Sequence, residues 1–98
     1  MPIQHTVVFR LAHEPGSDAE ARFLDDASTT LAAIPGVRDF AVNRQVGTKN
    51  DLAWQFSMVF ADQDAYESYN HHPAHVAFVR DRWQSEVAAF EEYDFIPR

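Results

Sequence analysis

The amino-acid sequence predicts an α+β domain in which helices cover one face of a four-stranded sheet. Two observations carry this prediction. Apolar and polar residues alternate over residues 3–11 and 52–60, and apolar residues recur every three or four positions over residues 18–34 and 73–90. In chain order the elements are strand, helix, strand, strand, helix and strand, which is the order of the ferredoxin-like fold. The chain has 98 residues and is expected to form one domain over residues 1–98.

The first strand is expected over residues 3–11, where Ile3, His5, Val7, Phe9 and Leu11 share one face. The strand is followed by Ser17-x-x-Glu20, which has the spacing of a capping box. In that motif each side chain accepts a hydrogen bond from the backbone amide of the other residue. The first helix should therefore begin there and end before Pro35-Gly36, which cannot continue a helix. Its apolar positions are Phe23, Leu24, Ala27, Leu31 and Ile34.

A second strand is expected at about residues 37–46, with Phe40, Val42 and Val46 on one face. Residues 47–51 are typical of a hairpin connection. The third strand shows the strongest alternation in the chain, and its apolar face carries Leu52, Trp54, Phe56, Met58 and Phe60.

The second helical region is predicted to be split at His72-Pro73. Asp62 is expected to cap a short first helix, and Pro73 suits the first turn of a new one, where its missing N–H would have no partner. One long helix is then predicted as far as Phe90, because its apolar residues follow helical steps. This stripe consists of Val76, Val79, Trp83, Val87 and Phe90. Residues 93–96 should form a short last strand, paired at an edge or with a partner chain.

Composition excludes several function classes. The chain has eight Lys and Arg residues and fifteen Asp and Glu residues. The resulting formal charge of -7 disfavours nucleic acid and anionic membranes as partners. The chain has no cysteine, which excludes disulfides and thiolate metal sites. No phosphate loop, nucleophile elbow or dinucleotide fingerprint is present. We find no signal-peptide pattern and no membrane-spanning run, so a soluble, cytoplasmic protein is expected.

The sheet face that points away from the helices is predicted to carry small or apolar side chains. Such residues are poorly suited to full exposure to water. We therefore expect this face to pack against a second copy in a symmetric homodimer. The residues concerned are Thr6, Val8, Ala41, Ala53, Ser57 and Val59.

Residues 69–75 contain the densest group of proton-handling side chains. His75 falls in the first turn of the predicted long helix, where unpaired backbone amides disfavour an imidazolium and keep the ring neutral. A neutral imidazole can act as a base. Tyr69 ends the preceding short helix, and a phenol with an ordinary pKa near ~10 is a hydrogen-bond donor at neutral pH. The bend between the helices could bring this base and donor to one cleft.

Other interpretations of these residues stay open. His5 is either a core histidine or an imidazole that lines a pocket. Asn70 or a histidine could simply cap the new helix. The nearby imidazoles have no carboxylate at matching spacing, so no metal and no other cofactor is expected. Trp54 and Phe56 are typical of core filling, and acidic pairs such as Glu91-Glu92 are expected to be solvated surface.

Four segments resemble the stress-responsive alpha/beta barrel (Dabb) family, in an order and spacing that cover nearly the whole chain. They are His5-Thr6-Val7-Val8-Phe9-Arg10, Ile34-Pro35-Gly36-Val37, Phe60-x5-Tyr66-x2-Tyr69 and His72-Pro73-Ala74-His75-x2-Phe78-Val79. The resemblance implies a ferredoxin-like protomer whose sheet packs against a second copy, forming a dimeric α+β barrel.

The resemblance also implies candidate functions. A few members of this family are polyketide cyclases that use a Tyr and a His placed like Tyr69 and His75, and His5 matches a pocket histidine of those enzymes. Trp54 stands where the cyclases carry another histidine, which implies a smaller and more apolar pocket. Certain relatives hold a magnesium ion near the dimer interface, but no residue set in this sequence places one.

Three functional hypotheses follow. In the first, a pocket takes a small aromatic or polyketide-like molecule and performs cofactor-free acid–base chemistry of a cyclase or lyase type. His75 is then the base, Tyr69 the donor to the enolate oxygen and His5 the residue that orients the substrate. Predicted substrate contacts are Trp54, Phe56, His72 and Phe78.

The second hypothesis is a non-catalytic stress-response dimer in which the His72-Pro73-x-His75 segment is structural. The third is a degradative enzyme similar to the cofactor-independent monooxygenases, which rests on analogy of fold alone.

Overall fold

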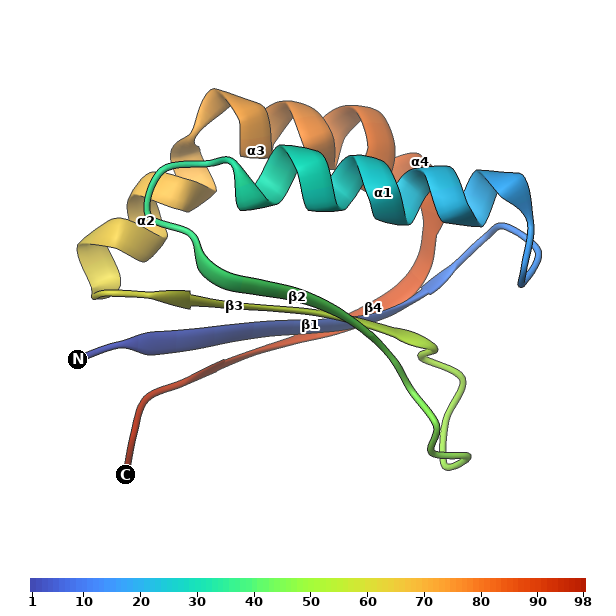
Figure 1. The fold of residues 1–98 in the computed structure, drawn as a ribbon, viewed down its shortest axis with the longest axis horizontal. Helices are drawn as coiled ribbons and strands as arrows, with labels where there is room; N and C mark the ends of the chain where they lie inside the picture. The colour runs from blue at the N-terminus through green and yellow to red at the C-terminus, as the bar shows by residue number, and fades with distance from the viewer.

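The computed structural model describes residues 1–98 and shows one antiparallel sheet with helices on one face (Figure 1). The strands lie in the order β2-β3-β1-β4, which is the predicted ferredoxin-like arrangement. The strands are β1 (Ile3–Leu11), β2 (Arg38–Arg44), β3 (Trp54–Phe60) and β4 (Val87–Phe95). The helices are α1 (Asp18–Ala32), α2 (Gln63–His71), α3 (Pro73–Phe78), the π-helix η1 (Val79–Trp83) and α4 (Gln84–Glu86).

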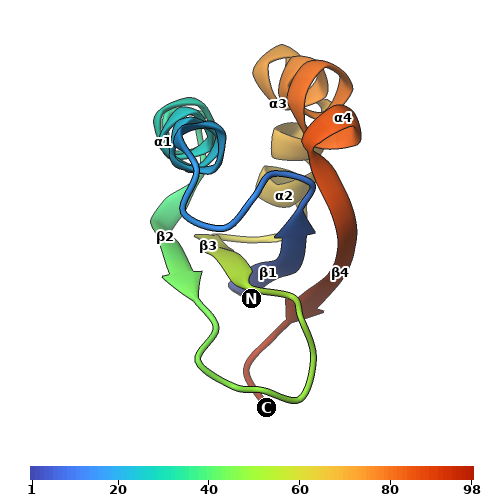
Figure 2. The ribbon, with the colours of Figure 1, turned by 90° about the vertical axis from the view of Figure 1, so that its right-hand side faces the viewer.

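The helical layer has two parts. Viewed from the end of the sheet, α1 lies on the β2 side, and α3 with α4 lies on the β4 side (Figure 2). Helix α1 contacts both β2 and α3. The last strand leaves the helical layer directly from α4 and returns along the sheet beside β1.

Side chains cap the helices largely as predicted. The Ser17 hydroxyl accepts from the backbone N–H of Glu20 at 3.2 Å, and the Glu20 carboxylate accepts from the N–H of Gly16 at 3.0 Å. The Glu20 carboxylate thus accepts from the N–H of Gly16, one residue before the N–H of Ser17 that the motif predicts. Asp62 caps α2 by accepting from the N–H of Ala65 at 2.9 Å. Each cap satisfies amides that the first turn of a helix leaves unpaired.

The core lies between the inner face of β1 and β3 and the helices. It is built around aromatic rings, of which Phe9, Phe23, Phe56 and Phe60 are almost completely buried. Phe9 lies at the centre, with ring centroids 4.6 Å from Phe56 and 5.1 Å from Trp83. This face of β1 is the one that the alternation predicted to be buried.

The prediction of one long helix ending at Phe90 is wrong. The helical segment ends at Glu86, and β4 then pairs with β1 along almost its whole length, with Phe90 opposite Phe9. A helix to Phe90 would leave the backbone groups on one side of β1 without partners, so strand pairing outweighs local helical spacing. Val76, the first residue of the predicted stripe, is 47% exposed and does not belong to the core.

The second strand is shorter than predicted. β2 ends at Arg44, and Val46 is 92% exposed, so Val46 does not share a strand face with Phe40 and Val42. A register shift between Arg38 and Ala41 marks a bulge near Asp39, whose φ is 53°. Aspartate is one of the few residues other than glycine that visits this left-handed region readily.

The outer face of the sheet carries Thr6 between Ser57 on β3 and Tyr93 on β4. Tyr93, Phe95 and Ile96 are exposed on or just beyond β4. Homodimerisation through this face stays a prediction. None of the helices combines the length and the apolar character that crossing a membrane would require.

Candidate functional site

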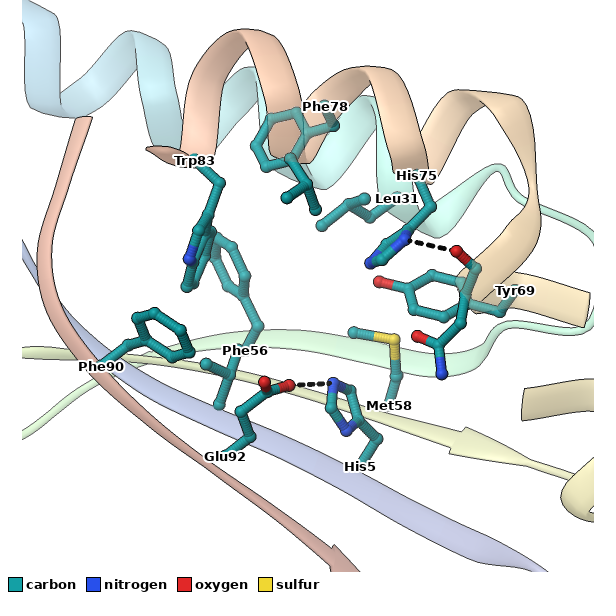
Figure 3. A pocket seen from close by; sticks show the side chains of 13 residues that line it. His5, Leu31, Phe56, Met58, Tyr69, His75, Phe78, Trp83, Phe90 and Glu92 are labelled. Carbon is teal, nitrogen blue, oxygen red and sulfur yellow. Dashed lines mark hydrogen bonds and ion pairs between the residues drawn. The ribbon is translucent and has the colours of Figure 1, made fainter. Parts of the chain in front are cut away.

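A cavity of about 250 Å³ lies between the sheet and the helical layer formed by α2, α3 and η1 (Figure 3). Nine of its thirteen lining residues are hydrophobic. Its walls include Phe56 from β3, Phe78 from α3 and Trp83 from η1. Ligand sites in proteins are commonly apolar hollows of this kind in which a few polar groups converge.

His75 projects into this cavity from the first turn of α3. Its Nδ1–H donates to the backbone carbonyl of Asn70 at 3.1 Å, since a carbonyl oxygen can only accept. The lone pair of a neutral ring therefore lies on Nε2. Burial lowers the pKa of His75 below its ordinary value of 6.5, so the ring is neutral at pH 7. The structure thus places a neutral imidazole with an available nitrogen in an apolar hollow.

Burial of neutral His75 should make the stability of the fold depend on pH. The unfolded chain binds a proton at this residue below pH 6.5, whereas the folded chain resists protonation because its pKa is lower. The stability that depends on neutral His75 is therefore fully present above pH 6.5. It is lost as the pH falls through the pKa of His75 in the folded chain. Urea unfolding at about pH 7.5 and about pH 5.5 should show a smaller loss for His75→Asn than for the wild type. Equal losses in both proteins would contradict this assignment.

Tyr69 lies in the last turn of α2 and is only 2% exposed. Its ring centroid is 4.5 Å from that of His75. Burial raises the pKa of Tyr69 far above its ordinary value of 10.0, so the hydroxyl keeps its proton. No group of the chain accepts a hydrogen bond from this hydroxyl, which is directed toward the cavity beside His75 (Figure 3). The structure brings the two predicted residues together, while their catalytic roles remain predictions.

His5 lies on the opposite side of the cavity, on β1, and is held by acidic and phenolic side chains. Its Nδ1–H donates to Asp94 Oδ1 at 2.6 Å, and Glu92 Oε2 lies 3.8 Å from its Nε2. The Tyr66 hydroxyl donates to Asp94 Oδ2 at 3.0 Å and lies 3.1 Å from His5 Nδ1. His5 is buried and hydrogen-bonded, but open volume lies next to its ring, so its position fits the interpretation of an imidazole that lines a pocket.

Sequence reasoning missed Tyr66, Glu92 and Asp94. The prediction that the Glu91-Glu92 pair is plain solvated surface is wrong for Glu92, which lines the cavity. Strand pairing explains this, because Glu92 lies opposite Val7 and Asp94 opposite His5 on the helix-facing side of the sheet. Residues 90–94 show no regular apolar alternation, because Phe90 shares its face with the polar residues Glu92 and Asp94, so the sequence pattern gave no signal for this part of the site.

Tyr66 also stays protonated. Burial, with a further contribution from Asp94, raises its pKa to about 12. Its hydroxyl is consequently a donor to Asp94 and fixes the carboxylate that holds His5.

Two of the four predicted substrate contacts lie elsewhere. Phe56 and Phe78 line the cavity, but Trp54 and His72 do not. The His72 ring is used as the cap of α3, where Nδ1 accepts from the N–H of Ala74 at 3.1 Å. The Trp54 indole N–H instead donates to Glu20 at 3.3 Å, beside the start of α1. Of the four predicted substrate contacts, only Phe56 and Phe78 therefore lie at the cavity.

The cavity contains the elements of acid–base chemistry but no arrangement suited to a metal. No group of three or more His, Cys, Asp or Glu side chains converges to hold an ion anywhere in the chain. The three imidazoles of residues 71–75 diverge, because His71 bonds the Glu67 carbonyl, His72 caps α3 and His75 faces the cavity.

Comparison with known proteins identifies relatives over the whole chain. The model of the stress responsive A/B barrel domain family matches residues 3–97. A Dabb family protein with a ferredoxin-like fold from Mesorhizobium loti is 55% identical, with a TM-score of 0.98, over 99% of this chain and 97% of that one. No curated protein matches the sequence.

More distant structures share the fold. A dimeric ferredoxin-like protein of unknown function from Thermobifida fusca is 21% identical, with a TM-score of 0.81, over 99% of this chain and 92% of that one. A hydroxynitrile lyase from Passiflora edulis is 10% identical, with a TM-score of 0.85, over 99% of this chain and 94% of that one. At these identities the similarity concerns the fold alone.

Proposed function

The chain belongs to the stress responsive A/B barrel domain family, and we propose that it binds a small apolar carbonyl compound and catalyses proton transfer at the carbon next to the carbonyl. No cofactor takes part in the proposed reaction. The observation that carries the proposal is the pairing of a neutral His75 with a protonated Tyr69 in one apolar cavity.

In the proposed reaction, Nε2 of His75 takes a proton from the α-carbon, and the electron pair of that C–H bond becomes part of an enolate. Tyr69 donates a hydrogen bond to the enolate oxygen, where negative charge develops. The apolar walls lower the local dielectric constant and so strengthen this interaction. His5 orients the substrate from the opposite side of the cavity. Delivery of this proton to a different carbon of the enolate system completes an isomerisation. In D₂O, exchange of the imidazolium proton with solvent before it returns to the α-carbon completes a hydrogen–deuterium exchange.

The hydrogen bond from His75 to the Asn70 carbonyl supports this assignment, because it orients the ring and directs the basic nitrogen away from the backbone. The hydroxynitrile lyase from Passiflora edulis also supports the proposal, because it is an enzyme of the lyase class that has this fold. We also propose that the working form is a homodimer, in line with the dimeric relative from Thermobifida fusca.

Deuterium exchange tests the proposal without knowledge of the natural substrate. In D₂O, the wild-type protein should accelerate loss of the α-proton signals of at least one compound in a panel of single-ring aryl ketones and cyclic β-diketones, followed by ¹H NMR. Tyr69→Phe removes the donor to the enolate and should slow this exchange by about 100- to 1,000-fold.

Tyr93→Phe is the matched control, because the Tyr93 hydroxyl donates to Glu91 on the outer face of the sheet. It should exchange the same compounds at the wild-type rate. Absence of exchange by the wild-type protein across the panel would overturn the proposed reaction.

A non-catalytic role is the second candidate, and the capping of α3 by His72 favours it. In that role the His72-Pro73-x-His75 segment fixes the junction of α2 and α3, and His75 serves by bonding the Asn70 carbonyl. The same panel would then show no exchange, and substitutions at His75 would alter stability alone.

A further inference from the structure

The edge strand β4 forms one side of the cavity and leaves it open to solvent. Phe90 and Glu92 both line the cavity, yet Phe90 is 49% exposed and the Glu92 side chain is 53% exposed. A side chain that faces both the cavity and the solvent lies at its mouth. A ligand that enters between β4 and the helices must therefore pass the Glu92 carboxylate (Figure 3).

No group in the cavity compensates the negative charge of Glu92. Lysine and arginine are absent from the lining residues. Tyr69 and His75 are both neutral at pH 7, because burial raises the pKa of the first and lowers that of the second. His5 lies between two carboxylates, Asp94 at 2.6 Å and Glu92 at 3.8 Å. Even a protonated His5 therefore leaves this end of the cavity with a surplus negative charge.

We infer that Glu92 determines specificity and makes the cavity select against anionic ligands and for ligands that present a hydrogen-bond donor toward β4. The inference rests on the proposed function in one respect, namely that this cavity is where the carbonyl compound binds. An amide or hydroxyl group of the ligand donates to the Glu92 carboxylate and places the carbonyl at the other end, beside Tyr69 and His75. A ligand carboxylate at the same position meets like charge and binds weakly.

The volume limits the size of this ligand. A dry cavity of roughly 150 Å³ is large enough for benzene. The cavity here, about 250 Å³, therefore takes one six-membered ring with small substituents at its two ends. Together with the charge argument, this describes a single-ring carbonyl compound with a hydrogen-bond donor group opposite the carbonyl.

Two nearly isosteric probes test the inference directly. 4-Acetylbenzamide and 4-acetylbenzoate have nearly the same shape, but at about pH 7.5 the first presents an N–H donor where the second carries a negative charge. Their dissociation constants are measured by NMR titration. The wild-type protein should bind the amide roughly ten- to a hundredfold more tightly than the carboxylate, and Glu92→Gln should reduce this preference to about threefold or less.

Glu91→Gln is the matched control. It makes the same change of charge on the adjacent residue, but Glu91 lies opposite Val8 on the outer face of the sheet. It should retain the wild-type preference. An equal effect of both substitutions would show that net charge alone is responsible, and it would overturn the inference. Failure of the wild-type protein to bind either probe, or a preference that survives Glu92→Gln, would overturn it as well.

The binding measurement separates this inference from the proposed reaction. His75→Asn should bind the two probes with the wild-type preference, since it leaves β4 unchanged. Preference for the amide without any α-proton exchange would overturn the proposed reaction and sustain the role of Glu92. Exchange accompanied by equal binding of the two probes would overturn the role of Glu92 and sustain the reaction.

Discussion

His75→Asn should slow α-proton exchange by about 100- to 10,000-fold, which is the usual contribution of a positioned general base. The asparagine amide nitrogen can replace Nδ1 as the donor to the Asn70 carbonyl, which His75 contacts at 3.1 Å. No basic atom then occupies the place of Nε2. The rate is measured in D₂O with the ketone that the wild-type protein exchanges fastest, at the same protein concentration for both.

The pH profile gives a second measurement of the same assignment. The wild-type rate should rise with pH through a pKa below 6.5, because the protonated ring cannot accept the proton and burial lowers its pKa. This rise should be absent from the residual rate of His75→Asn. A purely structural role of His75 would not produce this difference.

His71→Asn is the control for these measurements. His71 is exposed, and its Nδ1–H also donates to a backbone carbonyl, that of Glu67 at 3.0 Å. The ring does not line the cavity, so exchange should proceed at the wild-type rate. Undiminished exchange by folded His75→Asn would assign the proton transfer to another group and refute the role of His75.

The sequence predicts best those elements whose signals are local. The alternation of β1, the Ser17 and Asp62 caps and the break before Pro73 each involve a few adjacent residues, and all occur in the structure. The meeting of Tyr69 and His75 was predictable for the same reason, since one bend of the chain separates them. Local chemistry therefore accounts for the helical side of the site.

The β4 side of the site depends on contacts between distant parts of the chain. The spacing of Trp83, Val87 and Phe90 fits a helix, and only pairing with β1 makes an extended strand the better solution. Once β4 is a strand, Glu92 and Asp94 face the helices and His5 acquires its partners. Glu92 was therefore missed because its strand was predicted too short, and Asp94, inside the predicted strand, was missed because the pairing of that strand with β1 was not predicted.

Phe9→Ala should destabilise the fold by about 3–5 kcal/mol, the usual loss when a buried phenylalanine is truncated. Phe9 has no exposed surface, and its ring lies within 6.0 Å of the rings of Phe23, Phe56 and Trp83. These rings connect α1, β3 and η1, so the space left by Phe9 cannot close without moving several elements. A domain of this size has a total stability of about 5–15 kcal/mol, which makes the expected loss a large share of it.

Urea and thermal unfolding at one fixed protein concentration measure this effect, because association of copies would otherwise change the apparent stability. The expected loss corresponds to a decrease in Tm on the order of 15–30 °C. Phe9→Leu refills most of the volume and should cost only about 1–1.5 kcal/mol. Val46→Ala, at a residue that is 92% exposed, should change stability by less than about 0.5 kcal/mol.

Phe9 also connects the stability of the core to the shape of the ligand cavity. The residue does not line the cavity, but Phe56 and Trp83, which pack against it, do. Loosening these two walls should weaken binding of 4-acetylbenzamide to Phe9→Ala even at temperatures where the variant is fully folded. The preference for the amide over the carboxylate should persist, because Glu92 lies on β4 and its charge is unchanged. A loss of stability below about 1 kcal/mol would instead mean that the surrounding rings close over the vacated space.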